Sequence, residues 1–124
     1  MTADDIDDIE ATLGFKLPKC YRDVVLNYPD ALAETEAPDF GFFDTPTSVI
    51  EANIEVRKNG YFGQRWPDQY IIVGENGCGD YYVITKNATE FTVGFSDHET
   101  MECNLFASNL DEFVAKLLSE MDAG

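Results

Sequence analysis

The sequence contains few basic residues. Its 124 residues include 8 Lys and Arg, 24 Asp and Glu and one histidine, for a formal net charge of −16. The electrostatic field of this negative charge repels phosphate groups, which argues against nucleic acids and anionic membrane surfaces as partners. It favours a cationic protein, whose encounter it would accelerate. The alternative is that the charge only keeps the protein soluble and monomeric, and by itself the charge favours that interpretation.

Paired cysteines and long apolar runs are also missing. Cys20, Cys78 and Cys103 are widely spaced and form no CxxC pair, so we expect buried free thiols rather than a disulfide scaffold or a Cys-rich zinc site. Apolar runs such as residues 71–73 are too short to span a bilayer. The residues after Met1 lack the basic and apolar regions of a signal peptide. We therefore expect a cytoplasmic protein that does not associate with membranes.

No pattern of catalytic or metal-binding residues is present. His98 lies between Asp97 and Glu99, and a metal site could be built on one histidine and carboxylates, but a solvated histidine is the more usual outcome in a charged loop. A Cys–His dyad that uses Cys78 or Cys103 is not selected by any spacing. The sequence therefore predicts a non-enzyme with no catalytic residue, no cofactor and no bound metal.

The chain does contain enough apolar residues for one core, because 44% are hydrophobic and 13% aromatic. Apolar periodicity predicts helices over 4–13, 18–28, 45–60 and 108–121, the last with a Ser108–Asp111 capping signature. The helix over 45–60 is expected to begin with Thr45 as its cap and Pro46 in its first turn, and its apolar face should include Ile54. Strands are predicted at 40–43, 70–73, 81–85 and 91–95, with 31–39 a loop and 96–104 a polar connection. The expected fold is one α+β domain over residues 1–124, with a central, mostly antiparallel sheet packed by N-terminal, middle and C-terminal helices.

A glycine-rich stretch separates the strands predicted at 70–73 and 81–85. Gly74, Gly77 and Gly79 indicate positive φ angles or close backbone approach. A phosphate cradle does not fit, since the P-loop lysine is absent and Tyr82 replaces the third glycine of a dinucleotide fingerprint. The stretch instead predicts a tight connection in which Asp80 accepts hydrogen bonds from local backbone amides.

Two motifs in this order resemble the SUKH superfamily of Smi/Knr-like proteins. The first motif is E..LG..LP..Y, and the second is hxGxxGxGDxY, which begins at Ile72. The positions that carry the resemblance and that we interpret as structural are Gly14, Leu17, Pro18, Tyr21, Gly74, Gly77, Gly79 and Asp80. Many members have Asn-Gly-Gly after the second helix, whereas residues 27–30 of this chain have the sequence NYPD. This departure bears on the assignment to a subfamily more than on the fold.

The resemblance implies an α+β domain and, in bacteria, an immunity protein that neutralises a polymorphic toxin, often a nuclease. A regulatory or scaffolding module without a toxin partner is the alternative, and an enzyme ranks last. We expect a monomer or weak homo-oligomer that binds a cationic toxin domain near its strand connections, with whichever tyrosine points outward as an aromatic anchor. The candidate partner-binding residues are Glu75, Tyr81, Tyr82, Asp97, Glu99 and Glu102.

Overall fold

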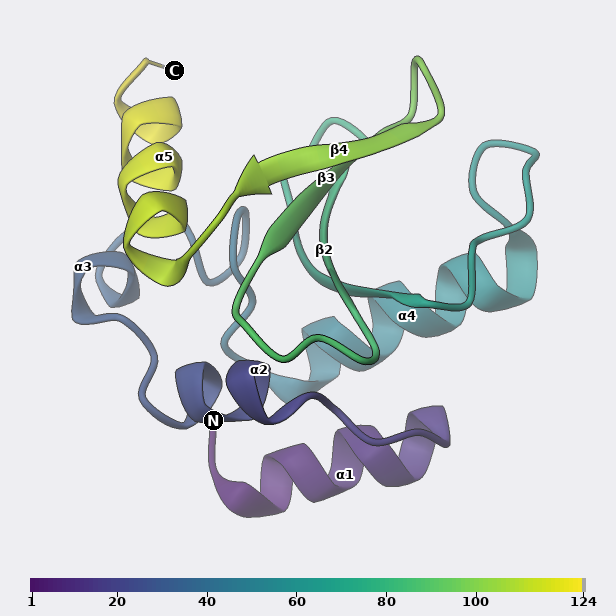
Figure 1. Cartoon of the computed structure of the whole chain (residues 1–124), viewed down its shortest axis with the longest axis horizontal. Helices are drawn as coiled ribbons and strands as arrows, with labels where there is room; N and C mark the ends of the chain where they lie inside the picture. The colour runs from purple at the N-terminus through teal and green to yellow at the C-terminus, as the bar shows by residue number, and fades with distance from the viewer. Residues whose placement is uncertain (124) are drawn as a thin grey trace.

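A computed structural model of the protein describes residues 1–123, and Figure 1 shows the arrangement of its helices and strands. The helices are α1 (Ala3–Leu13), α2 (Lys19–Leu26), α3 (Asp30–Ala33), α4 (Pro46–Asn59) and α5 (Leu110–Ala123). The strands are β1 (Tyr70–Glu75), β2 (Tyr81–Thr85), β3 (Val93–Asp97) and β4 (Glu102–Ala107). The protein is α+β, with an antiparallel sheet packed against helices, as the sequence predicts.

The four strands form an antiparallel meander in the order β1-β2-β3-β4. In such a meander alternate connections lie at the same end, so residues 76–80 and 98–101 lie at one end of the sheet and 86–92 at the other. Helix α4 packs on β1 and α5 on β4, while α1 packs on α4 and α3 on α5. In Figure 1 α5 and α3 lie on one side of the sheet, with α1 and α2 below it.

An aromatic core lies between the sheet and the helices. Tyr82 of β2 is 1% exposed, and its ring contacts Phe95, Phe106 and Phe113 from β3, β4 and α5. The Tyr82 hydroxyl donates to a carboxylate oxygen of Glu120 at 2.8 Å. Side chains alternate along a strand, so Tyr81 points to the opposite face of the sheet.

The first of the two motifs, E..LG..LP..Y, joins α1 to α2. Gly14 ends α1 at φ +81°, where a residue with a Cβ is strained. The carboxylate of Glu10 accepts the Leu17 backbone N–H at 2.7 Å, which fixes the turn. Pro18 caps the start of α2, and Tyr21 in its first turn is fully buried. The motif therefore specifies a helix–turn–helix entry to the core.

The outer edge of β1 is paired by side chains instead of a fifth strand. The buried Asn53 amide of α4 donates to the Ile72 carbonyl and accepts from the Ile72 N–H, both at 2.9 Å. Arg57 and Trp66 donate to the Tyr70 carbonyl at 2.8 and 3.0 Å. These bonds satisfy strand groups that are otherwise left unpaired at an edge.

The connections contain more regular structure than the sequence predicts. Residues 31–39 are not all loop, because Pro29 caps the short helix α3. Residues 40–43 form turns rather than a strand, although the Phe43 N–H still donates to the Val73 carbonyl at 2.9 Å. The expected polar connection at 96–104 is wrong, because it contains the end of β3 and the first half of β4.

Two details of the predicted helices are also wrong. The side chain that caps α5 is Asn109, which accepts the Glu112 N–H at 2.8 Å, so the Ser108–Asp111 signature is displaced by one residue. In α4 the predicted apolar residue Ile54 is 41% exposed, while Asn53 and Val56 are buried. The Thr45 cap and Pro46 start of α4 are confirmed. Within residues 1–123, no helix combines the length and apolar character needed to cross a membrane.

Candidate functional site

Four of the predicted partner-binding carboxylates belong to one end of the sheet. Glu75 ends β1 and, through the strand register, heads a row that runs across Tyr81, Ser96 and Cys103. The next pair is Asp97 with Glu102, and Glu99 lies in the turn between them. We call Glu75, Asp97, Glu99 and Glu102 the acidic rim. Burial raises the pKa of the Glu75 carboxyl above its usual value, whereas Glu99 and Glu102 have no side-chain bond among the described residues.

The two tyrosines of the prediction have different environments. Tyr82 is buried against α5 and cannot contact a partner in this structure. Tyr81 is half-buried on the other face, with its ring against Tyr61 and Trp66 at centroid distances of 5.5 and 6.0 Å. Of the two, Tyr81 therefore remains the candidate anchor.

We call residues 76–80 the glycine loop. The glycines in this loop and just before it have little space for a side chain. A Cβ on Gly74, just before the loop, would lie 1.5 Å from the Gly41 carbonyl oxygen. Gly79 has φ +97°, and a Cβ there would lie 2.9 Å from the Phe62 ring. Gly77 has φ +80° and lies against the Phe40 ring. The predicted backbone demand of these three glycines is confirmed, and it includes both close approach and positive φ.

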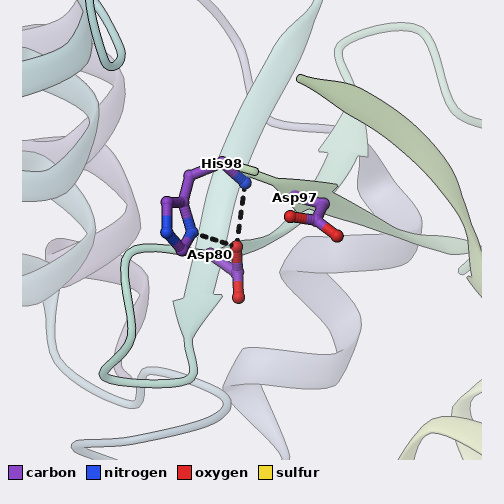
Figure 2. Close-up of side chains that lie close together, drawn as sticks. All are labelled: Asp80, Asp97 and His98. Atoms are coloured by element: carbon purple, nitrogen blue, oxygen red, sulfur yellow. Dashed lines mark hydrogen bonds and ion pairs between the residues drawn. The ribbon is translucent and has the colours of Figure 1, made fainter. Parts of the chain in front are cut away.

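Asp80 joins the glycine loop to the β3–β4 turn, as Figure 2 shows. Its Oδ1 accepts the His98 backbone N–H at 2.9 Å and lies 2.7 Å from the His98 Nδ1. Its Oδ2 accepts from the Asn76 amide at 2.8 Å. The expected bonds from Asp80 to local amides are instead made by Asn76, whose Oδ1 accepts from Cys78 and Asp80.

These contacts shift both pKa values. Burial pushes the pKa of Asp80 upward, but hydrogen bonds from the His98 backbone, Asn76 and the imidazole outweigh it, so the pKa lies below the usual value. The hydrogen bond to Asp80 raises the pKa of His98, and the charges of Asp80, Glu99 and Asp97 raise it further. The prediction of a simply solvated histidine is therefore wrong: His98 is paired, and its side chain is 25% exposed.

Two exposed phenylalanines flank the glycine loop. Phe62 is 61% exposed at φ +47°, and its ring lies 4.7 Å from the His98 imidazole. Phe40 is 54% exposed beside Gly77. Exposed apolar side chains that gather at one place are typical of binding sites, and these two rings lie against two glycines of the same loop. The sequence does not distinguish these two phenylalanines from the aromatic residues of the core. In the structure, Phe62 also differs from the core aromatic residues by its left-handed backbone.

The chemical capacity of the site is limited by its hydrogen bonds. Ligand atoms of Asp80, Asp97 and His98 lie within 4.8 Å of one another, so they could contact one cation. However, Asp80 already accepts three hydrogen bonds, and Asp97 Oδ1 accepts the Glu99 N–H at 2.8 Å. A metal on His98 Nδ1 would have to replace its bond to Asp80. The arrangement is better suited to fixing two turns than to coordinating an ion.

The three cysteines differ in exposure, and the thiolate form is disfavoured at two of them. Cys78 is exposed in the glycine loop, so the expectation of a buried thiol is wrong there. Cys20 and Cys103 are half-buried, and burial raises the pKa of both thiols, which disfavours the reactive thiolate.

Comparison with known families identifies the chain. The helix–turn–helix entry, the meander with a glycine-rich first connection and the closing helix form the α+β domain that the resemblance to the SUKH superfamily implies. The profile of the SMI1 / KNR4 family (SUKH-1) matches residues 1–116, and the chain belongs to this family. Comparison with curated proteins and with solved structures gives no significant match.

Proposed function

We propose that this SUKH-1 domain is an immunity protein that binds a cognate polymorphic toxin domain and neutralises it by covering its functional surface. A nuclease-type toxin fits best, because a surface that binds phosphate groups is cationic and complements a chain of net charge −16. The proposal is that of a stoichiometric inhibitor rather than a catalyst.

The observation that supports the proposal most directly is the combination of exposed aromatic rings and carboxylates around one rigid loop. Phe62 and Phe40 offer apolar contact area beside the glycine loop, and the acidic rim adds negative charge at the same end of the sheet. The Asp80–His98 contact and the Tyr61 hydroxyl, which donates to the Gly79 carbonyl at 2.8 Å, hold this end of the sheet. A preorganised surface loses less conformational entropy on binding.

The test is kinetic. The protein is co-expressed with any toxin domain found to be encoded beside its gene. Association and dissociation rates are then measured between about 50 and 500 mM salt, a range over which screening of surface charge strengthens. We expect Glu75→Gln, Glu99→Gln and Glu102→Gln together to slow association and weaken its salt dependence. Phe62→Ala should mainly speed dissociation, by about tenfold or more for an anchor worth over 1.4 kcal/mol.

A matched control removes the same charge elsewhere. Asp4, Asp7 and Asp8 are exposed on α1, so their change to Asn alters the net charge equally without touching the acidic rim. This control should affect association less than the rim variant. If the protein neither binds the neighbouring toxin domain nor protects cells that express it, the immunity proposal is wrong. Equal effects of the two triple variants would contradict the rim as the contact surface.

A further inference from the structure

The two edge strands of the sheet, β1 and β4, differ in how many of their outward backbone groups are hydrogen-bonded by side chains. On β1, Asn53, Arg57 and Trp66 pair with the outward backbone groups. On β4, among residues 1–123, the side-chain partners of backbone groups are Thr100, which accepts the Glu102 N–H at 3.3 Å, and Lys116, which donates to the Phe106 carbonyl at 2.7 Å. The middle of β4 therefore lacks the cover that β1 has.

The register identifies which groups of β4 point outward. The Met101 N–H donates to the Asp97 carbonyl at 2.8 Å, and Met101 has φ +60°, which closes a four-residue turn between the paired Asp97 and Glu102. In antiparallel sheets hydrogen-bonded and non-hydrogen-bonded pairs alternate. Because the turn makes Asp97 and Glu102 a hydrogen-bonded pair, Glu102 and Asn104 direct their backbone groups to β3. Cys103 and Leu105 direct theirs to the outside.

This edge has a partly apolar hollow on one face and a carboxylate at one end. Leu105 is 65% exposed and lines a hollow of about 350 Å³, whose apolar side is formed with Val83 and Cys103 and whose polar side includes Thr92 and Glu90. Glu102 lies on the other face of β4, opposite its pair partner Asp97 of the acidic rim. Such an edge offers backbone bonds, a place for apolar side chains and a site for positive charge.

The geometry points to β4 as the site where an extended, cationic segment of the partner protein adds as a fifth strand. The segment bonds to the backbone of Cys103 and Leu105, places alternate apolar side chains over the hollow and directs basic side chains toward Glu102. This inference rests on the proposed function for the identity of the partner, and it specifies how that partner binds. A second copy of this chain fits less well, since each copy carries a charge of −16.

The probe is a capped eight-residue peptide of alternating lysine and valine, with an alternating glutamate–valine peptide as its control. In the free protein, the amides of Cys103 and Leu105 should exchange with solvent faster than those of Glu102 and Asn104. Addition of the lysine–valine peptide should shift the Cys103 and Leu105 amide signals and slow their exchange. The glutamate–valine peptide should do neither.

Leu105→Pro tests the backbone bond itself. It removes an outward N–H, which an edge strand tolerates, and should raise the peptide Kd about tenfold, the effect of losing roughly 1.4 kcal/mol. Leu105→Ala keeps the N–H and should have a smaller effect. Asn104→Pro removes an N–H that faces β3 and should lower the melting temperature, unlike Leu105→Pro.

Several results would overturn the inference. These are protected Cys103 and Leu105 amides in the free protein, no response of these amides to the lysine–valine peptide, or equal binding by wild type and Leu105→Pro. Dimerisation that Leu105→Pro abolishes would show that the occupant is a second copy instead. If Leu105→Pro binds the neighbouring toxin domain like wild type, the strand-addition mode fails while the immunity proposal stands. If wild type binds no toxin, the immunity proposal fails, and the peptide data still decide the edge.

Discussion

The side chain of Asp80 connects the two turns of the candidate site. One carboxylate contacts the Asn76 side chain, the His98 backbone and the His98 ring, and so joins two turns that are 18 residues apart. Phe62 covers the imidazole on its other side. The position of the Phe62 ring therefore depends on the Asp80–His98 ion pair. Of these two partners, only His98 titrates near neutral pH.

We predict that His98 titrates above its ordinary value of 6.5, because Asp80, Asp97 and Glu99 all favour the imidazolium. A raised folded-state pKa means that the stabilisation is fully present below the unfolded pKa and is lost as the pH rises through the folded value. The chain has one histidine, so its ring signals in an NMR pH titration report this group alone.

The control for this titration is Asp80→Asn, which removes the first cause of the shift and should move the His98 pKa back toward 6.5. A wild-type pKa at or below 6.5, or the same pKa in both proteins, would contradict the assigned interaction.

At this scale the sequence predicts backbone requirements better than side-chain partners. Gly77 and Gly79 stand out because few residues adopt their φ angles, and this requirement is local. The Asp80–His98 contact depends on the register of β2 with β3, which no local pattern specifies. The exposure of Phe62 likewise depends on a positive φ that its residue type does not favour.

Among the elements, α4 has a second task beside packing. Its buried Asn53 makes two bonds to Ile72 and also accepts from the Arg57 guanidinium at 2.8 Å. The helix therefore pairs both outward backbone groups of Ile72, in the middle of the β1 edge, through one amide. A polar residue on the buried face of a helix is explained here by the strand groups it satisfies.

We predict that Asn53→Leu lowers the free energy of unfolding by about 2–4 kcal/mol, because it leaves a buried N–H and a buried carbonyl of Ile72 unpaired. Chemical denaturation measures the change. Asn59→Leu is the matched control on the same helix, and it should change stability by less than about 0.5 kcal/mol because Asn59 is exposed. A loss for Asn53→Leu as small as that of the control would show that the edge is not closed by this amide.

The elements that the sequence identifies have either a helical period or a continuous apolar run. Helices α1, α2 and α5 have buried residues at helical spacing, whereas β1 and β2 are short runs whose central residues are all buried. Strand β4 was missed because Glu102, Asn104 and Leu105 are all exposed, so its sequence lacks the alternation of a half-buried strand. The error at Ile54 arises because the buried stripe of α4 passes through Asn53, which hydropathy assigns to the surface.

For the whole molecule, charge opposes compactness. A net charge of −16 on 124 residues produces repulsion between carboxylates that salt screens. We predict that the melting temperature rises by about 5 °C between 10 and 200 mM NaCl, as expected for roughly 1 kcal/mol in a domain of this size. Differential scanning calorimetry at constant pH measures the change.

The control for the salt effect is again the change of Asp4, Asp7 and Asp8 to Asn, which lowers the negative charge by three and should reduce the rise. Asp5 is left intact because it closes the capping box of α1 with Thr2. A melting temperature that is constant or falls with salt would show that self-repulsion does not limit stability.

The separation between Asp80 and the acidic rim affects how such a protein can evolve. The fold at this end of the sheet depends on glycine backbone geometry and on Asp80, whereas the side chains of Glu75, Glu99 and Glu102 make no hydrogen bond or ion pair among the described residues. Exposed positions without such contacts usually change at little energetic cost. Under the proposed function, successive substitutions at the exposed Glu99 and Glu102 would alter which toxin is recognised while the scaffold persists, and this would let an inhibitor follow a rapidly changing target.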